Sequence, residues 1–229
     1  MNDAIVRRMH DILGAGLDLK ERLDRGETPA FETESGRLKA LVLGDASLAQ
    51  DPAYNGELAG LAFRPDADFD AGDRFLGARY ALACWLDEVF ILDAPTWWAE
   101  RWEGNTFETA LYGGTQQRAW RFWDQAQRAD GPRGSVAALE AYLWCVMLGF
   151  RGSPPEDLHP AAWVEASRKR VMSLRSTEFP APPERDLPTA VPPLRGRERF
   201  ARMCRVATFA AAGAAFAVGV WATRLLATR

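Results

Sequence analysis

The sequence predicts an all-α protein in which a bundle of about six helices precedes one transmembrane helix. Three observations predict this class. Apolar residues recur at helical spacing through residues 1–176, without the alternation typical of strands. A proline-rich and then arginine-rich linker follows at 177–203. The segment 204–226 contains 18 consecutive uncharged residues and is expected to hold the transmembrane helix and a short C-terminal stub.

The apolar periods place the helices of the first part. The first helix is expected to end at Gly26, with an apolar stripe made of Ile5, Met9, Ile12, Leu17 and Leu23. A central helix is expected at 71–92, stopping before Pro95 and followed by an irregular, tryptophan-rich region. Four other helices are expected at 33–43, 115–129, 135–149 and 160–174, with Ser135 and Pro160 marking the starts of the last two.

Nine tryptophans supply large side chains for packing or for contact surfaces. Two pairs at helical spacing are expected to form core stripes, Trp120 with Trp123 and Leu143 with Met147. Trp97 and Trp98 come soon after Pro95. We therefore expect these two tryptophans in a loop, partly exposed, as a surface for contact with a partner protein.

The transmembrane prediction depends on residues 206–223. At about 1.5 Å per residue, a helix of this length spans roughly 27 Å, close to the thickness of a bilayer core. The segment has no polar face at helical spacing, so it is not an amphipathic surface helix. Because eight of its 18 residues are alanine, a soluble core helix is the alternative. Side chains expected in lipid include Val206, Phe209, Gly213, Phe216, Gly219 and Trp221.

Charge predicts how the span is oriented. Five arginines lie within 195–205, whereas two follow the span. The positive-inside rule therefore leaves the N-terminal domain in the cytoplasm and a short C-terminal stub outside. The start of the chain has no basic and apolar leader, which agrees with a cytoplasmic domain. Small residues recur at four-residue spacing in the span, which would permit self-association through the membrane.

The overall charge of −3 is distributed unevenly, because the arginine-rich tail masks an acidic N-terminal domain. An acidic surface disfavours nucleic acid, whose binding requires neutralised phosphates. The three cysteines lie far apart in apolar runs and show neither a disulfide framework nor zinc spacing. The two histidines do not form a metal spacing either, and no phosphate loop is complete. We expect no catalytic residue, cofactor, metal or small-molecule substrate.

The most informative local pattern is an acidic pair, Asp87 and Glu88, in the apolar central helix. A helix that is apolar on all sides is normally buried, and a buried carboxylate needs partners. Two interpretations remain open. The pair could cap backbone N–H groups of another helix or pair with an arginine such as Arg79 or Arg101. Alternatively, it could form a sheltered acidic site for a basic partner protein.

A family resemblance enters through this region. The chain has Tyr80-Ala81-Leu82 before Leu86-Asp87-Glu88, then a tryptophan-rich stretch and a Gly-Gly step, and it closes on Leu148-Gly149-Phe150-Arg151-Gly152. In order and spacing, this pattern resembles the DotU/TssL (IcmH-like) proteins of bacterial type VI and related type IV secretion systems. The resemblance covers roughly residues 70–155.

The resemblance implies a hook-like cytoplasmic domain of two small helical sub-bundles, anchored in the bacterial inner membrane by one C-terminal helix, with the C-terminus in the periplasm. It implies a structural subunit that associates with a large TssM/IcmF-like membrane protein, contacts baseplate components and associates with itself. Asp87 and Glu88 would then contact a partner rather than act in catalysis. The leading hypothesis is thus a non-enzymatic secretion scaffold. The alternatives are a tail-anchored enzyme with an acidic site at this pair and a soluble helical adaptor.

Overall fold

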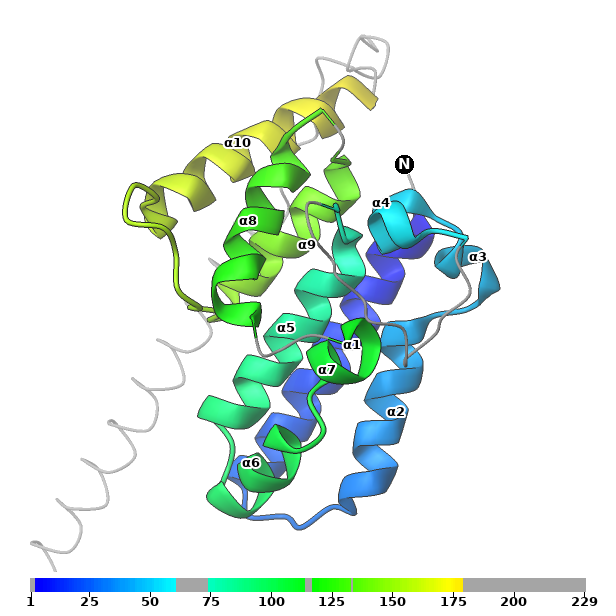
Figure 1. The fold of residues 1–229 in the computed structure, drawn as a ribbon, viewed down its shortest axis with the longest axis vertical. Coiled ribbons are helices and arrows are strands. Elements are labelled where there is room, and N and C mark those ends of the chain that lie inside the picture. Colours follow the sequence, from blue (N-terminus) through cyan, green and yellow to red (C-terminus); the bar gives the residue numbers. More distant parts are fainter. Residues whose placement is uncertain (1–2, 61–73, 114–116, 133, 179–229) are drawn as a thin grey trace, which may run out of the picture. The chain divides into compact units, whose positions relative to one another are not determined.

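The computed structural model describes residues 3–60, 74–113, 117–132 and 134–178. Within these ranges every regular element is a helix and no strand occurs, which confirms the all-α prediction (Figure 1). The elements are α1 (Asp3–Asp24), α2 (Phe31–Leu43), α3 (Ala46–Ala49), α4 (Pro52–Asn55), η1 (Gly56–Leu58), α5 (Gly77–Leu92), α6 (Thr96–Glu103), α7 (Phe107–Tyr112), α8 (Arg118–Asp130), α9 (Val136–Met147) and α10 (Pro160–Glu178).

Helix α5 is the central element of the described domain. It is buried continuously from Gly77 to Phe90, and α1, α2, α4, α6, α7, α8 and α9 pack around it (Figure 1). The sequence explains this position, because apolar side chains on every side of the helix can be removed from water only if neighbours surround it. The prediction of a central helix is confirmed, and its core position explains why both acidic residues need internal partners.

The central helix begins later than the predicted residue 71. Residues 74–76 precede the helix without regular secondary structure, and Gln125 of α8 holds them there. Leu76 N–H donates to the side-chain oxygen of Gln125 at 2.7 Å, and the side-chain NH₂ of Gln125 donates to the Arg74 carbonyl at 2.8 Å. Gly77 has φ of 70°, and a Cβ there would lie 2.4 Å from the Tyr54 carbonyl oxygen. This close backbone approach requires glycine and fixes where the helix starts.

Helices α1 and α2 form an antiparallel hairpin against α5. The predicted stripe is correct at four of its five positions but wrong at Leu17, whose side chain is 42% exposed. At 3.6 residues per turn the stripe passes through Gly16 instead. A Cβ on Gly16 would lie 2.8 Å from both Trp85 and Leu86, so the side chains of α5 fill the space that a larger residue would occupy.

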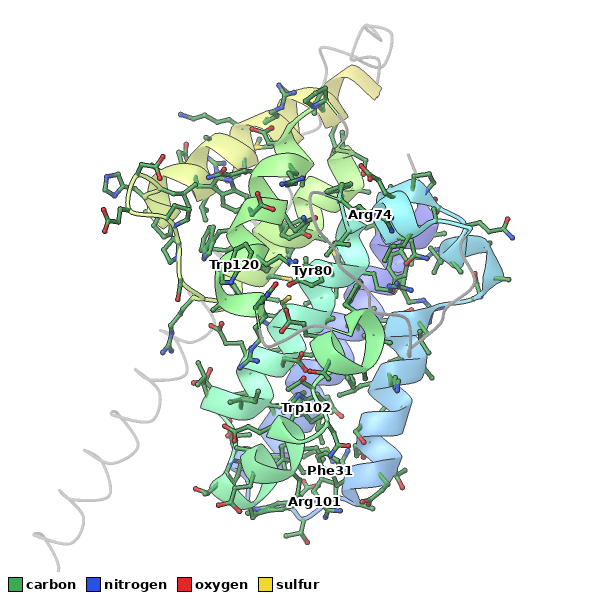
Figure 2. The ribbon with its side chains drawn as sticks, viewed as in Figure 1. Phe31, Arg74, Tyr80, Arg101, Trp102 and Trp120 are labelled. Atoms are coloured by element: carbon green, nitrogen blue, oxygen red, sulfur yellow. The ribbon has the colours of Figure 1, made fainter. Side chains whose placement is uncertain are left out.

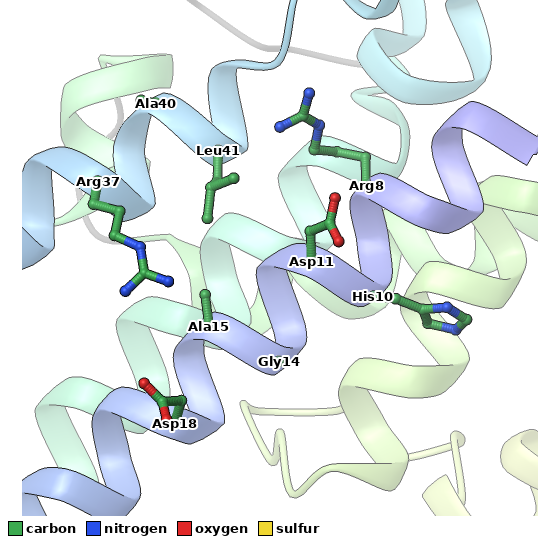
Figure 3. A pocket seen from close by; sticks show the side chains of 9 residues that line it. All are labelled: Arg8, His10, Asp11, Gly14, Ala15, Asp18, Arg37, Ala40 and Leu41. Carbon is green, nitrogen blue, oxygen red and sulfur yellow. The ribbon is translucent and has the colours of Figure 1, made fainter.

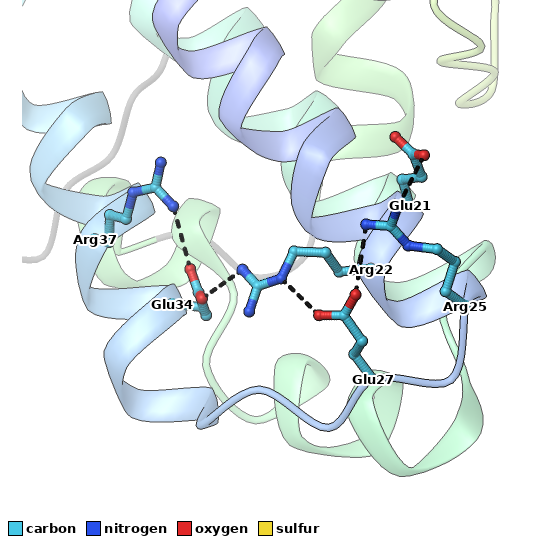
Figure 4. A network of polar contacts seen from close by, with 6 residues as sticks. All are labelled: Glu21, Arg22, Arg25, Glu27, Glu34 and Arg37. Carbon is cyan, nitrogen blue, oxygen red and sulfur yellow. Dashed lines mark hydrogen bonds and ion pairs between the residues drawn. The ribbon is translucent and has the colours of Figure 1, made fainter.

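An ion-pair network fastens the end of α1 to α2 (Figure 4). Arg22 donates to Glu34 at 2.7 Å and to Glu27 at 3.1 Å, and Arg37 approaches Glu34 at 3.5 Å. Hydrogen bonds to the two glutamates raise the pKa of Arg22 above its usual value. Because such surface pairs contribute little free energy, the network chiefly sets the register of the hairpin.

Helices α8, α9 and α10 pack together beside α5 (Figure 1). Ser135 caps α9 as predicted, since its hydroxyl accepts from Ala138 N–H at 3.1 Å. Phe122 of α8 stacks on Phe150 with ring centroids 3.8 Å apart. The aromatic face of α8 thus covers the loop that follows α9.

Two predicted core residues are instead exposed. Trp120 is 52% exposed, because it lies about 160° around α8 from the buried Phe122. Met147 is 54% exposed, because α9 ends at this residue and the chain turns away. Their predicted stripe partners, Trp123 and Leu143, are buried as expected.

The sequence predicted an irregular region after α5, and this prediction is wrong. This region forms the short helices α6 and α7, which the tryptophan-rich composition did not indicate. In the described ranges, no helix is long and apolar enough to cross a bilayer. The predicted boundary at 176/177 stays a prediction, and the predicted transmembrane residues Val206, Phe209, Gly213, Phe216, Gly219 and Trp221 lie outside the described residues.

Candidate partner-binding site

Asp87 and Glu88 lie side by side near the middle of α5 and point to different neighbours. Adjacent helical residues project about 100° apart, so one carboxylate faces α6 and α7 and the other faces the loop after α9. Asp87 has no accessible surface, and Glu88 is 7% exposed. Each carboxylate therefore depends on hydrogen bonds from the protein itself.

Asp87 joins α5 to both short helices of the tryptophan-rich region. One carboxylate oxygen accepts from the Trp102 indole N–H at 2.9 Å and from Phe107 N–H at 2.8 Å, and the other accepts from Glu108 N–H at 2.8 Å. Phe107 and Glu108 open α7, so Asp87 caps the N-terminus of that helix from across the domain. Trp102 belongs to α6, and its indole ring also packs on Phe31 of α2 (Figure 2).

Burial dominates the electrostatics of Asp87. Removal from water raises the pKa of this carboxyl to about 6, although its three hydrogen bonds act in the opposite direction. The group is ionised at neutral pH, and its three donors then match its two oxygens. Both oxygens of this carboxylate already accept hydrogen bonds within the fold, so in this geometry they are not free to take a proton from a substrate.

Glu88 holds the loop after α9 against α5. One of its oxygens accepts from Arg151 N–H at 2.6 Å, and the other accepts from Gly152 N–H at 3.1 Å. Gly152 has φ of 52°, a left-handed conformation, and a Cβ there would lie 2.5 Å from the Ala119 carbonyl oxygen, so this position requires glycine. Trp123 adds a further hydrogen bond from its indole to the Arg151 carbonyl at 3.0 Å. The two ends of the sequence pattern, the acidic pair and the glycine-containing close, are therefore one structural unit.

These contacts confirm the first of the two interpretations, capping of backbone N–H groups. The suggested arginine partners are engaged elsewhere: Arg79 donates to the Tyr112 hydroxyl at 3.0 Å, and Arg101 pairs with Glu32. Contact of the acidic pair with a partner protein stays a prediction. Because Asp87 is fully buried, such contact would require α6 and α7 to move away from α5.

The two tryptophans predicted in a loop lie on helix α6, and the structure separates them. Trp98 has no accessible surface and packs against Phe90 of α5, with ring centroids 6.1 Å apart. Trp97 is 39% exposed. The prediction that both are partly exposed is wrong for Trp98, because adjacent residues of a helix project about 100° apart and Trp98 faces the core. Trp97 is the member of the pair that a partner could reach.

Sequence reasoning missed a buried polar cluster beside the acidic pair. Tyr80 of α5 donates its hydroxyl to Glu108 at 3.0 Å, and it packs edge-on against Tyr112 at 5.0 Å (Figure 2 shows Tyr80 at the centre of the domain). Burial raises the pKa of Tyr80 far above its usual value. Glu108 has no accessible surface, and one of its oxygens has no hydrogen-bond partner among the described residues. Its position in a short amphipathic segment gave no sign of this burial.

Two open grooves lie away from the acidic pair. One, of about 750 Å³, runs between α1 and α2 (Figure 3). The other, of about 550 Å³, lies between α2 and the α6–α7 segment and is crossed by the Arg101–Glu32 ion pair. Neither Asp87 nor Glu88 lines either groove. Open grooves between helices suit another protein segment better than a small substrate.

Metal and thiol chemistry have no visible site in the part of the chain that the structure describes. Groups of three or more residues able to hold a metal ion do not occur in it. Cys84 and Cys145 are free and buried, and burial raises the pKa of both thiols well above the usual value. These cysteines pack as small apolar side chains.

Comparison with known proteins gave one family match. Residues 69–226 match the family described as type VI secretion system protein DotU. Among solved structures, the crystal structure of the type VI secretion protein SciP/TssL from enteroaggregative Escherichia coli 042 is similar, with 18% sequence identity and a TM-score of 0.49. That match covers 82% of this chain and 99% of the other. The curated proteins contained no match.

Proposed function

The chain belongs to the DotU family of type VI secretion system proteins, and from this premise we propose that it is a scaffold subunit of the secretion system's inner-membrane complex. In this role it links a TssM/IcmF-like membrane protein to cytosolic baseplate components and associates with a second copy of itself. It has no substrate to transform. Its helical domain provides the surfaces on which other proteins assemble.

The observation that carries this proposal is the extent of the family match. It runs to residue 226 and so includes the 18 uncharged residues of 206–223 together with the arginines that precede them. We propose that 204–226 crosses the inner membrane once, with the helical domain in the cytoplasm and the C-terminus in the periplasm.

The geometry of the acidic pair supports a scaffold over an enzyme. Asp87 and Glu88 were the strongest candidates for acid–base chemistry, and their oxygens accept hydrogen bonds from the backbone of α7 and of the loop after α9. A carboxylate that holds two segments together serves stability and shape. Trp97 and the two open grooves remain as accessible surfaces for protein partners.

The test of anchoring uses the full chain in bacterial cells. Alkaline phosphatase fused after Arg229 should be active, because this enzyme folds only in the periplasm, whereas the same fusion after residue 203 should be inactive. The protein should also stay in membranes washed with sodium carbonate at high pH. A cytoplasmic reporter after Arg229, or release of the chain by the carbonate wash, would contradict the proposed topology.

A further inference from the structure

Trp120 is an exposed aromatic side chain near the start of α8 (Figure 2). It is 52% exposed, whereas Phe122 and Trp123 on the same helix are buried. Tryptophan offers a large and rigid contact area, and it is among the residues that most often anchor protein interfaces. Trp120 is therefore a candidate anchor for another protein.

Two arginines lie beside Trp120 at the start of α8. Arg118 and Arg121 are three residues apart and are therefore neighbours on the helix surface. Arg121 is only 8% exposed, and its guanidinium lies 5.6 Å from the centre of the Trp120 ring. Within the ranges that the structure describes, neither arginine side chain forms an ion pair or a hydrogen bond. A cation held this far from water normally has an anion beside it.

Two acids near these arginines are already engaged within the domain. Asp124, one turn after Trp120, pairs with Arg128 at 2.9 Å. Burial raises the pKa of Asp87, and the charge of Arg118 lowers it by less than the three hydrogen bonds do. Because both carboxylates have partners of their own, they leave the guanidinium groups beside Trp120 without a bound anion.

The end of the helix gives a second reason to expect an anion here. The first turn of α8 contains no acidic residue, and the Gln117 side chain does not cap the helix. The N-terminus of a helix is the positive end of its dipole, so cations placed there are unfavourable. Arg118 and Arg121 lie at this end. An approaching carboxylate would relieve both sources of repulsion.

The loop after α9 adds a cation on the other side of Trp120 (Figure 1). Residues 119 and 121 project about 100° to either side of residue 120. Ser153 N–H of the loop donates to the Ala119 carbonyl at 2.7 Å. The Arg151 side chain in this loop is 74% exposed and lies 4.0 Å from Asp93. Three arginines thus surround one exposed tryptophan on a domain whose overall charge is acidic.

We propose that Trp120 and the arginines around it bind an acidic segment of another protein of the secretion apparatus. In this contact the tryptophan ring packs on an apolar part of the segment. A carboxylate next to that part accepts hydrogen bonds from Arg118 and Arg121, whose planar guanidinium groups match its two oxygens. The inference deepens the proposed function and rests on it, because it assigns one partner contact a place and a chemistry.

Arginine and tryptophan also occur where proteins touch anionic membranes, yet the geometry favours a protein segment. Membrane attraction by charge takes clusters of about 4–8 basic residues, whereas three arginines are present here. A flat layer of headgroups would not reach the Arg121 guanidinium, which is 8% exposed, but a single protruding carboxylate would. The acidic charge of the domain also repels an anionic membrane.

Photo-cross-linking in cells that carry the secretion gene cluster identifies the bound segment. Trp120 of the full chain is replaced by p-benzoylphenylalanine, and the adducts are mapped by mass spectrometry. We expect an adduct with a segment of the TssM/IcmF-like protein or of a baseplate component, with Asp or Glu next to the cross-linked residue. The same photo-reactive residue at the exposed Gln127, two turns further along the same side of α8, should give much less adduct.

The mapped segment is then made as a labelled peptide and titrated by fluorescence anisotropy against the detergent-solubilised full chain. Arg118→Glu and Arg121→Glu should each weaken binding about tenfold or more, as expected for an interface hot spot. Arg121→Lys should weaken it less, because the charge is kept while the planar guanidinium is lost. Changing the acids of the peptide to lysine should weaken binding to the wild type and strengthen binding to Arg121→Glu.

Matched controls separate this contact from general charge effects and from misfolding. Arg25→Glu makes the same charge change on an exposed residue after α1 and should leave the peptide affinity unchanged. A peptide of scrambled sequence and equal composition should bind several-fold more weakly. If far-UV circular dichroism shows that Arg121→Glu is unfolded, Arg118→Glu and the charge-reversed peptide decide the question.

The inference would be overturned if position 120 gave no more adduct than position 127, or an adduct with lipid or with a second copy of the chain. A mapped segment without an acid, or equal binding of the scrambled peptide, would overturn it as well. Failure of this contact is distinguishable from failure of the proposed function. In each of these cases the chain would still be anchored in the membrane and would still co-purify with a TssM/IcmF-like protein.

Discussion

Replacing Asp87 with alanine should destabilise the domain, and the structure gives the size of the effect. The substitution leaves three buried donors without their acceptor: the Trp102 indole and the Phe107 and Glu108 N–H groups. At about 1–3 kcal/mol for each unsatisfied donor, the gross loss is roughly 3–9 kcal/mol. The loss lies toward the lower end of this range, because burial of the charge outweighs the three hydrogen bonds and raises the pKa of Asp87 from 3.8 to about 6, so that the charged form is about 3 kcal/mol less favourable than the protonated form in the fold.

The expected net loss in the free energy of unfolding is therefore about 3 kcal/mol, a large part of the roughly 5–15 kcal/mol that a domain typically has. For a chain of this size, the loss corresponds to a fall in Tm of about 6–12 °C. Urea unfolding of the detergent-solubilised full chain, followed by far-UV circular dichroism and by tryptophan fluorescence, measures it. Asp87→Asn should be less harmful, because its amide oxygen can still accept from Trp102 and Phe107 while its NH₂ would face only the Glu108 N–H.

Asp18→Asn is the control, since this acid is exposed on α1 and should change the free energy of unfolding by less than about 0.5 kcal/mol. The reasoning would be refuted if Asp87→Ala unfolded at the same urea concentration as the wild type while losing its secretion partners. That outcome would mean that Asp87 acts on a partner and that its hydrogen bonds to α6 and α7 contribute little.

Three further predictions follow from the same contacts. Between pH 4 and about 6 the folded state keeps a proton on Asp87 that the unfolded state releases. The contribution of Asp87 to the free energy of unfolding is therefore full below pH 4 and falls by about 3 kcal/mol as the pH rises through 6. Urea titrations of wild type and Asp87→Asn at several pH values should show this slope in the wild type alone. Glu88→Gln should destabilise by about 1–2 kcal/mol and speed amide hydrogen exchange in the loop after α9, with unchanged exchange there contradicting the assigned role. Gly16→Ala should lower stability by about 1–3 kcal/mol because its methyl group would meet α5 at 2.8 Å, whereas Gly14→Ala, two residues away in open space, should raise it by about 0.5–1 kcal/mol; equal thermal shifts in both would count against the packing described for α1.

The sequence predicted the helical class and the central helix because these depend on local periodicity. Leu82, Trp85 and Val89 reveal a helix without a polar side, and such a helix must be surrounded. The same reasoning placed a cap at Ser135, where residue type alone is informative. Family membership followed from the order of the motifs and was confirmed by the match over residues 69–226.

The sequence could not predict features that depend on contacts between distant segments. The start of α5 is set by Gln125, 49 residues after the Leu76 N–H that its side chain binds. In the sequence, Gly16 interrupts the apolar stripe of α1, and only the structure shows that the Trp85 side chain occupies the space beside it. Asp87 reads equally well as a cap or as a binding site, because its partners lie 15 to 21 residues further along the chain.

The prediction of the tryptophan-rich region failed for a related reason. A run of bulky residues after a proline suggested a loop, yet Thr96–Glu103 forms a helix whose two faces differ. Trp98 and Trp102 turn inward onto Phe90, and Trp97 turns outward. The spacing of four between Trp98 and Trp102 was the available signal, and a helical interpretation would have separated Trp97 from Trp98 in advance.

The most direct measurement is purification of the tagged full chain from detergent-solubilised membranes of cells that carry its secretion gene cluster. A secretion scaffold should bring down the TssM/IcmF-like membrane protein in comparable amount, and the same preparation from cells lacking that protein should still contain the folded, anchored chain. Recovery of the chain from membranes with no TssM/IcmF-like protein, under conditions where both are expressed, would contradict the proposed scaffold function.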